Sequence, residues 1–401
     1  MRILYLTHDM PWRSAFIRTL SLAKGMAARG HEVWLSASRE EPGPGRKTWP
    51  CCGVRIVEVG DRLPRRVRNG GLSPLDAFRR MRFARSRTWD VVHAMSHRPA
   101  VVSAGWTAAR RSRALYCFDW MDGWGFEGIA AWRRGYERWM LGGLDELLER
   151  FQLRLADGVT AVNDALMQRA VRVLGPERVE ILAPGANVDL IRPRPPAAYR
   201  KRFDLDGSDF VIVNAAQNPY DADLVMTTFN DVARECPRAR LLWAGPVDPR
   251  LKSRAEALGI ADRTRFPGLV PYLALGEVLA CGDVMFLPYR DSAVNRQRSP
   301  SKLGDFRAAG GPVGSRTAPG LVARAAAQRA ALLAEPTPQA CARAILALAA
   351  DPGLCAVMGR SARRFATSEL DWAHRAERAE AFYLRLEKEK EEKKTYRKMS
   401  K

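Results

Sequence analysis

The stretch SPSKLGDFRAAGGPV, residues 299 to 313, combines residue types that can hold a phosphate group. Ser299 is a plausible helix N-cap and Pro300 suits the first helical position. We therefore expect unpaired backbone amides at the helix start, those of Ser301, Lys302 and Leu303. Lys302 adds a positive charge, and Asp305 could accept hydrogen bonds from ribose hydroxyls. This segment predicts a cradle for a nucleoside diphosphate, although a helix packed by Leu303 and Phe306 under solvated charges is the alternative.

A second segment, YCFDWMDGWGF over residues 116 to 126, places two carboxylates among aromatic rings directly after a predicted strand. Aromatic faces can stack on a sugar ring while Asp119 and Asp122 accept from its hydroxyls. A purely structural loop is the competing interpretation. The pair is also typical of glycoside hydrolases, but loop spacing does not provide the carboxyl separation that such an assignment needs.

Short β-branched runs alternate with helical stretches along the chain and predict parallel sheets built from βαβ units. The rhythm restarts after Pro193-Arg194-Pro195-Pro196, which predicts two α/β Rossmann-like domains with ligands at the carboxyl ends of their strands. We expect a first domain over 1–192, a linker over 193–208, a second domain over 209–365, a helix over 366–388 and a charged tail over 389–401.

The segment from Pro300 to Val313 resembles the PSKxxEYMAxGxPVV-like motif of the retaining, nucleotide-sugar-dependent glycosyltransferases of family 4. DVVHA at 90–94 and the turn at 184–189 are similar to further segments of that family. The resemblance implies the GT-B fold, with two doubly wound domains facing a cleft and a C-terminal helix that crosses back to the first domain. It implies sugar transfer to an acceptor hydroxyl with retention and without a metal.

Departures from the family pattern concern charge at the expected donor site. The acid of the family's helix is here Asp305, and Gln297 stands where the family has another acid. The family's Arg and Lys, which neutralise the departing diphosphate, are missing from residues 214–221. The expected substitutes are the cations Lys302, Arg290, Arg296 and Arg298.

Acceptor contacts are expected from loops that follow strands of the first domain. Trp12 and Arg13 stand where the family often has two glycines, and could stack on a sugar or hold a phosphate. Trp12 as a packing residue is equally open. His93 is interpreted first as a hydrogen-bonded, half-buried histidine and second as an acceptor contact. His97 with Arg98 could reach an acceptor phosphate. Asp119 occupies the place of a family histidine near the anomeric carbon and could orient the acceptor hydroxyl.

The charge and the cysteine content limit which classes of protein fit this sequence. The net charge is +21, and nine arginines lie between Arg62 and Arg87 against the single acid Asp76. This segment predicts a basic patch that suits an anionic membrane surface, or it reflects composition alone. The seven cysteines are scattered without a CxxC pair, which fits a reducing compartment and predicts neither a zinc site nor a disulfide framework.

We expect a cytoplasmic chain, because no apolar run is long enough to span a membrane. The basic segment would place it peripherally on the inner face of a membrane. Its partners would be a nucleotide sugar as co-substrate and a sugar or lipid-linked acceptor, with no cofactor and no nucleic acid. Two other hypotheses are a weakened GT-B protein that binds nucleotide sugar without turnover, and a basic membrane-surface binding protein. Nucleotide base, sugar, acceptor and oligomeric state are not indicated by the sequence.

Overall fold

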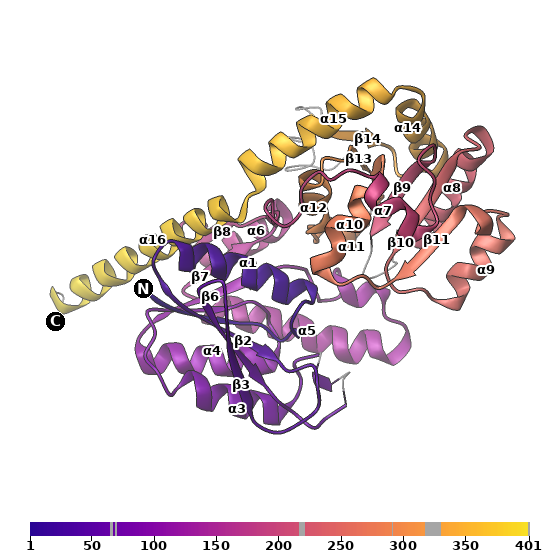
Figure 1. The fold of residues 1–401 in the computed structure, drawn as a ribbon. Coiled ribbons are helices and arrows are strands. Elements are labelled where there is room, and N and C mark those ends of the chain that lie inside the picture. Colours follow the sequence, from indigo (N-terminus) through magenta and orange to yellow (C-terminus); the bar gives the residue numbers. More distant parts are fainter. Residues whose placement is uncertain (65–66, 69, 216–220, 291, 317–329, 400–401) are drawn as a thin grey trace. The chain divides into compact units, whose positions relative to one another are not determined.

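The computed structural model describes residues 1–401 except 65–66, 69, 216–220, 291, 317–329 and 400–401 (Figure 1). The chain divides into two compact units. Unit 1 contains Met1–Pro184, Ala293–Ser299 and Trp372–Lys401, and unit 2 contains Gly185–Ser292 and Pro300–Asp371. The short segment Ala293–Ser299 therefore belongs to the N-terminal unit, although it comes from the middle of the C-terminal half of the sequence.

Unit 1 is built on an eight-stranded sheet in the order β3-β4-β2-β1-β5-β6-β7-β8. All neighbouring strands pair in parallel except β3 and β4. The strands are β1 (Arg2–Leu6), β2 (Glu32–Ser38), β3 (Arg46–Cys51), β4 (Val54–Val59), β5 (Val91–Ala94), β6 (Leu115–Trp120), β7 (Gly158–Ala161) and β8 (Val179–Ile181).

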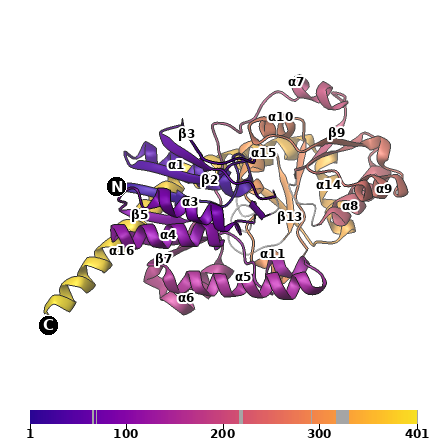
Figure 2. The ribbon, with the colours of Figure 1, turned by 90° about the horizontal axis from the view of Figure 1, so that it is seen from below.

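Two hydrophobic layers cover the faces of this sheet. One contains inward side chains of α3, α4 and α6, and the other contains those of α1 and α16. The helices of unit 1 are α1 (Ser14–Ala28), α3 (Pro74–Ala84), α4 (Pro99–Ser112), α5 (Gly135–Leu155), α6 (Asp164–Leu174), α11 (Ala293–Arg296) and α16 (Trp372–Met399). Figure 2 shows α3, α4 and α5 from below.

The last helix returns to the first unit as the family resemblance implied. α16 packs along α1, and a Cβ built on Gly25 would lie 2.5 Å from the Cβ of Ala376. A glycine at this position lets the two helix backbones approach closely. The ring of Trp372 lies 5.7 Å from the guanidinium of Arg18, so α16 also covers a charged residue of α1.

Unit 2 is a six-stranded parallel sheet in the order β11-β10-β9-β12-β13-β14. Its strands are β9 (Phe210–Ala215), β10 (Ala239–Ala244), β11 (Thr264–Gly268), β12 (Val284–Phe286), β13 (Val313–Arg316) and β14 (Ala331–Ala334). Its helices are α7 (Ala197–Arg200), α8 (Ala222–Glu235), α9 (Pro249–Ala257), α10 (Leu275–Ala280), α12 (Lys302–Ala308), α14 (Pro338–Ala350) and α15 (Pro352–Phe365).

The two predicted Rossmann-like sheets are confirmed, and the differences from expectation are local. The 3₁₀ turn Ile129–Trp132 is separate from α5, because Arg133 and Arg134 between them are extended, with ψ of 156° and 154°. Strand β3 was not predicted. It is a polar strand containing Pro50 that pairs only with β4, an edge position where proline is tolerated.

Within the described part of the chain, no single helix has the length and apolar composition of a membrane span. Two helical segments that are sharply bent against each other, Pro338–Ala350 and Pro352–Leu370, have that length and apolar composition only when taken together.

Candidate active site

The carboxylate of Asp119, at the end of β6, is fully engaged by side chains of unit 1. Arg18 on α1 donates to both carboxylate oxygens, at 2.8 and 2.9 Å, and Thr160 on β7 donates to one of them at 2.6 Å. Burial alone would raise the pKa of Asp119, but the charge and hydrogen bonds of Arg18 outweigh burial and hold the pKa below its ordinary value. Asp119 is thus a charged partner of Arg18, and its contact with an acceptor stays a prediction.

His93, at the end of β5, lies in the same buried network. Its Nδ1 is 2.6 Å from the hydroxyl of Tyr383 on α16, and its Nε2 is 3.2 Å from the hydroxyl of Thr160. Burial lowers the pKa of His93 to about 4, so the ring is neutral at physiological pH. The interpretation of His93 as a hydrogen-bonded buried histidine agrees with this geometry.

His97 faces a carboxylate of α5 instead of open solvent. Its Nε2 lies 3.1 Å from Asp145, which also accepts from Arg98 at 2.7 Å and from Arg133 at 2.8 Å. The guanidinium of Arg98 lies 4.2 Å from the ring centre of Trp124. Both His97 and Arg98 are buried, so this cluster fixes the start of α4 against α5.

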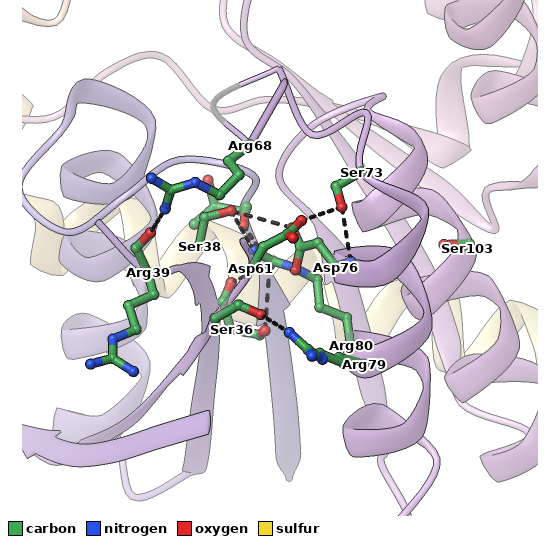
Figure 3. Close-up of polar contacts among 12 residues, drawn as sticks. Ser36, Ser38, Arg39, Asp61, Arg68, Ser73, Asp76, Arg79, Arg80 and Ser103 are labelled. Carbon is green, nitrogen blue, oxygen red and sulfur yellow. Dashed lines mark hydrogen bonds and ion pairs between the residues drawn. The ribbon is translucent and has the colours of Figure 1, made fainter. Parts of the chain in front are cut away.

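The loops after β1, β2 and β4 are joined by buried arginines, as Figure 3 shows. Arg80 on α3 pairs with Asp76 at 2.7 Å and donates to the carbonyl of Thr7 and the hydroxyl of Ser38. Arg68 donates to the carbonyl of Arg39 at 2.7 Å. Arg68 and Arg80 were expected in a basic surface patch, and for these two that prediction is wrong because backbone carbonyls and a carboxylate bind them inside the fold.

The loop between β1 and α1 carries Trp12 in a left-handed conformation, with φ 65°. This backbone region favours glycine and is uncommon for a bulky residue. The ring of Trp12 is 41% exposed and makes an edge contact with Phe16, while Arg13 pairs with Glu40 at 3.3 Å. The loop therefore keeps a glycine-like turn and presents an indole at the surface.

Asp122 and the segment Ala293–Ser299 meet within unit 1. Asp122 and Arg298 form an isolated antiparallel bridge, and their side chains approach to 3.6 Å. Desolvation raises the pKa of Asp122 to about 6, against the opposing charge of Arg298. An acid with this pKa changes its charge near neutral pH.

Gln297 is buried in the same contact. Its side chain accepts from Arg169 at 2.5 Å and donates to the carbonyl of Glu127 at 3.1 Å, and a Cβ on Gly123 would collide with its amide. Gln297 thus holds the 293–299 segment against the loop that follows β6. Donor contact by Gln297 remains a prediction.

The cradle helix of unit 2 begins later than expected. α12 starts at Lys302, with Ser301 already in helical geometry, so the prediction of Ser299 as the N-cap is wrong. A tight turn precedes it, in which the amide of Leu303 donates to the carbonyl of Pro300 at 3.2 Å. The amide of Leu303 is therefore already hydrogen-bonded within the chain. The amides of Ser301 and Lys302 remain as the candidate anion ligands at this end of the helix.

Asp305 is buried in a small network of unit 2. Tyr272 donates to its carboxyl at 3.0 Å, and the amide of Asn187 donates to the Tyr272 hydroxyl at 2.6 Å. Desolvation raises the pKa of Asp305 to about 7, although the hydrogen bond from Tyr272 opposes the shift. Tyr272 was not singled out by its sequence, because nothing in the motif marks a partner 33 residues upstream.

The expected substitute cations lie in different environments. Arg290 is exposed and faces Asp221 and Asp223 of unit 2 at 3.8 and 3.6 Å, whereas Arg296 is exposed on α11 of unit 1. The loop that lacks the family's Arg and Lys falls mostly on residues 216–220, outside the described residues. Among the described residues, no group of three His, Cys, Asp or Glu side chains is arranged to hold a metal ion.

The fold and these strand-end loops define a GT-B-type protein, and comparisons with known proteins agree. Residues 17–185 match the family described as "Glycosyl transferase 4-like domain". Sucrose-phosphate synthase from Thermosynechococcus elongatus has a similar structure, with a TM-score of 0.76, 18% identity, and coverage of 96% of this chain and 99% of that one. HepE from Anabaena, solved with UDP and glucose, gives a TM-score of 0.69 at 16% identity, covering 95% of this chain and 98% of that one.

A curated relative is the D-inositol 3-phosphate glycosyltransferase of Segniliparus rotundus, 28% identical over 121 residues. That match covers 28% of this chain and 27% of the length of the relative. The N-terminal unit thus contains a glycosyl transferase 4-like domain over residues 17–185, and the chain has the GT-B fold. The resemblance seen in the sequence is confirmed.

Proposed function

We propose that the protein transfers a hexosyl group from a nucleotide-diphosphate sugar to an acceptor hydroxyl, with retention of configuration and without a metal. The observation that carries this proposal is the family 4 domain over residues 17–185, joined to a second Rossmann-like unit with the PSK motif at Pro300, Ser301 and Lys302. UDP is the first nucleotide to test, because HepE, of similar fold, is described in complex with UDP and with UDP-glucose.

The donor half of the proposed site is centred on the start of α12. Lys302 supplies charge to the leaving diphosphate, and the amides of Ser301 and Lys302 donate to its oxygens. Asp305 contacts the ribose from the same helix, with Tyr272 holding one carboxyl oxygen. The remaining donor candidates are Ser299, Leu303, Arg290, Arg296, Gln297 and Arg298.

The acceptor half is assigned to strand-end loops of unit 1. Trp12 is the best supported contact, because a strained backbone holds an exposed aromatic ring where a sugar could stack. Arg13 and Asp122 are the accompanying polar groups. Asp119, His93 and His97 are buried and bonded to neighbours, so in this proposal they position the loops that carry the acceptor contacts.

We place this activity at the cytoplasmic face of an anionic membrane, where a lipid-linked glycan or glycolipid would be the acceptor, as in envelope polysaccharide synthesis. All seven cysteines are free thiols, and Arg62, Arg82, Arg85 and Arg87 of the basic segment are exposed on unit 1. Nucleic acid is not part of the proposal.

Calorimetric titration with UDP, GDP and ADP, followed by turnover of the matching nucleotide sugars, tests the donor half. We expect one nucleotide to bind, and Lys302→Ala to weaken that binding at least about tenfold, the loss of one charge-assisted contact. Arg250→Ala on α9 is the control, because Arg250 is exposed at the start of another helix of unit 2 and is outside the proposed site.

Three results would change the proposal. Equal binding by wild type and Lys302→Ala removes Lys302 from the donor half. Binding of no nucleotide overturns the donor assignment as a whole. Tight binding without turnover of any sugar favours the weakened, non-transferring GT-B protein, for which the substitution of Gln297 for the family's acid is the motivating observation.

A further inference from the structure

Helix α5 of unit 1 has its polar and apolar faces reversed relative to an ordinary surface helix. Its buried face carries Asp145, Glu149 and Gln152, together with Gly142 and Leu153. Its exposed face carries large apolar side chains, of which five are between 52% and 74% exposed: Tyr136, Trp139, Met140, Leu147 and Phe151. A surface helix of a globular protein normally directs apolar residues inward and polar residues to water.

The buried polar face is satisfied, so the reversal is built into the fold. Asp145 accepts from Arg98 and Arg133, as described above. Glu149 accepts from the indole of Trp120 and the amide of Trp124, both at 2.8 Å, and Gln152 accepts from Tyr116 at 3.0 Å. These contacts fix the rotation of α5 about its axis, and the apolar side chains are therefore held outward.

The outward residues form one continuous stripe. At 100° per residue, positions 136, 139, 140, 144, 147 and 151 fall within an arc of about 140°. Leu144, at 38% exposure, completes the row between Met140 and Leu147. Monomeric proteins seldom expose apolar side chains in such a contiguous group, so the stripe marks a surface that is covered in use.

The charges around the stripe indicate what covers it. Exposed residues of the helix and its approach include four arginines (Arg134, Arg138, Arg150 and Arg154) against one exposed acid, Glu137. On the helical wheel, Arg150 and Arg154 lie within the stripe itself. Arg150 pairs with Glu146 at 3.1 Å, and the long side chain of Arg154 can reach past the apolar residues. An apolar face with tryptophan, tyrosine and arginine is typical of a helix that lies in the interface of an anionic bilayer.

Neighbouring helices of the same layer continue this character. On α4, the exposed Trp106 lies under the guanidinium of Arg110 at 5.6 Å. On α3, Phe78 is 59% exposed, and Arg82 and Arg85 are exposed beside it in the sequence. Figure 2 shows α5 along the lower border of the view, beside α6.

We infer that the stripe of α5, residues 136, 139, 140, 144, 147 and 151, inserts into the interface of an anionic lipid bilayer and docks unit 1 there. This inference rests on the membrane-facing part of the proposed function and names the surface that makes the contact. The arginines would lie among lipid phosphates while the aromatic rings enter the boundary between head groups and acyl chains. A second copy of the chain is the competing occupant.

Vesicle co-sedimentation of the full chain tests the inference. The vesicles are phosphatidylcholine alone, or phosphatidylcholine mixed with phosphatidylglycerol. We expect binding to the mixed vesicles that weakens with salt, and a loss of at least about tenfold in the double variant Trp139→Ser with Leu147→Ser. Leu384→Ser on α16 is the matched control, because Leu384 is a 52% exposed leucine of the same unit outside the stripe.

A charge variant, Arg138→Gln with Arg154→Gln, should weaken binding to mixed vesicles and leave binding to phosphatidylcholine unchanged. Nucleotide binding, measured by calorimetry on each variant, should equal that of wild type. A folded double variant that still binds mixed vesicles like wild type would overturn the inference. Sedimentation that shows a dimer in wild type and a monomer in the double variant, without vesicle binding, would assign the stripe to a second copy.

Failure of the proposed sugar transfer remains distinguishable from failure of docking. Vesicle binding without any nucleotide binding would support the stripe and contradict the donor assignment. Nucleotide turnover on a free sugar acceptor without vesicle binding would do the opposite.

Discussion

Asp119 in unit 1 and Asp305 in unit 2 are both buried aspartates of the predicted site, yet their pKa values shift in opposite directions. Asp119 faces the guanidinium of Arg18, and its pKa lies below the ordinary value. Asp305 accepts hydrogen bonds from the hydroxyl of Tyr272 and the backbone amide of Asn187. Desolvation raises its pKa to about 7, although these bonds and the charge of Lys302 oppose the shift. Burial alone therefore does not determine whether a carboxyl is charged. The two-point contact with Arg18 outweighs desolvation at Asp119, whereas the groups around Asp305 do not.

The largest effect is expected at Asp119. Asp119→Asn leaves the guanidinium of Arg18 buried without its counter-charge, which should reduce the free energy of unfolding by about 3–5 kcal/mol. Urea unfolding at pH 7 measures this. Asp122→Asn is the control, because the side chain of Asp122 is 33% exposed and its change should cost far less. A loss below about 1 kcal/mol at Asp119 would contradict the contrast between the two aspartates.

Asp305→Asn should act mainly through pH. The folded pKa of Asp305 is raised above its unfolded value, so the native state keeps a proton that the unfolded chain loses between pH 4 and pH 7. Wild-type stability from this group should fall as the pH rises through that window, by up to about 4 kcal/mol, and Asp305→Asn should lack the fall. Stability curves of both proteins at several pH values check the sign; a parallel pair of curves would contradict it.

Smaller effects on stability and on carboxyl pKa are expected when the hydroxyl donors Tyr272 and Thr160 are removed. Tyr272→Phe removes one hydrogen bond to Asp305 and should lower stability by about 1–2 kcal/mol. It should also raise the pKa of Asp305 further, because that bond favours the charged form. Thr160→Val, which removes a donor to Asp119, should leave Asp119 charged because Arg18 remains. NMR titration of the two carboxyls distinguishes these outcomes.

Strand positions were largely predictable, because β-branched runs, Gly-Gly-Pro stops and helical periods are local patterns. The return of the last helix to the first unit was implied only by the family resemblance. The start of α12 was not, because Ser299 and Ser301 are equally good caps and only the turn at Pro300 selects between them. Strand β3 carries too few apolar residues to be recognised before β4 pairs with it.

The hydrogen-bond and ion-pair partners of the predicted site residues could not be inferred from local sequence patterns. Arg18 and Asp119 are 101 positions apart, and nothing near either residue indicates the other. Arg80 sits in an arginine-rich run that resembles a solvated surface, yet its place over the ends of β1 and β2 buries it completely. The reversed α5 was likewise hidden, since a periodic apolar stripe is ordinarily interpreted as a core face.

The backbone of Trp12 has a consequence for how the first loop tolerates change. With φ at 65°, every residue that has a β-carbon meets the same crowding, so trimming the indole to a methyl group relieves nothing. Only replacement by glycine, which has no β-carbon, relieves the backbone strain of the turn. A scan with alanine would therefore misjudge this position, and the seemingly drastic exchange for glycine is the one that separates what the ring contributes from what the turn demands.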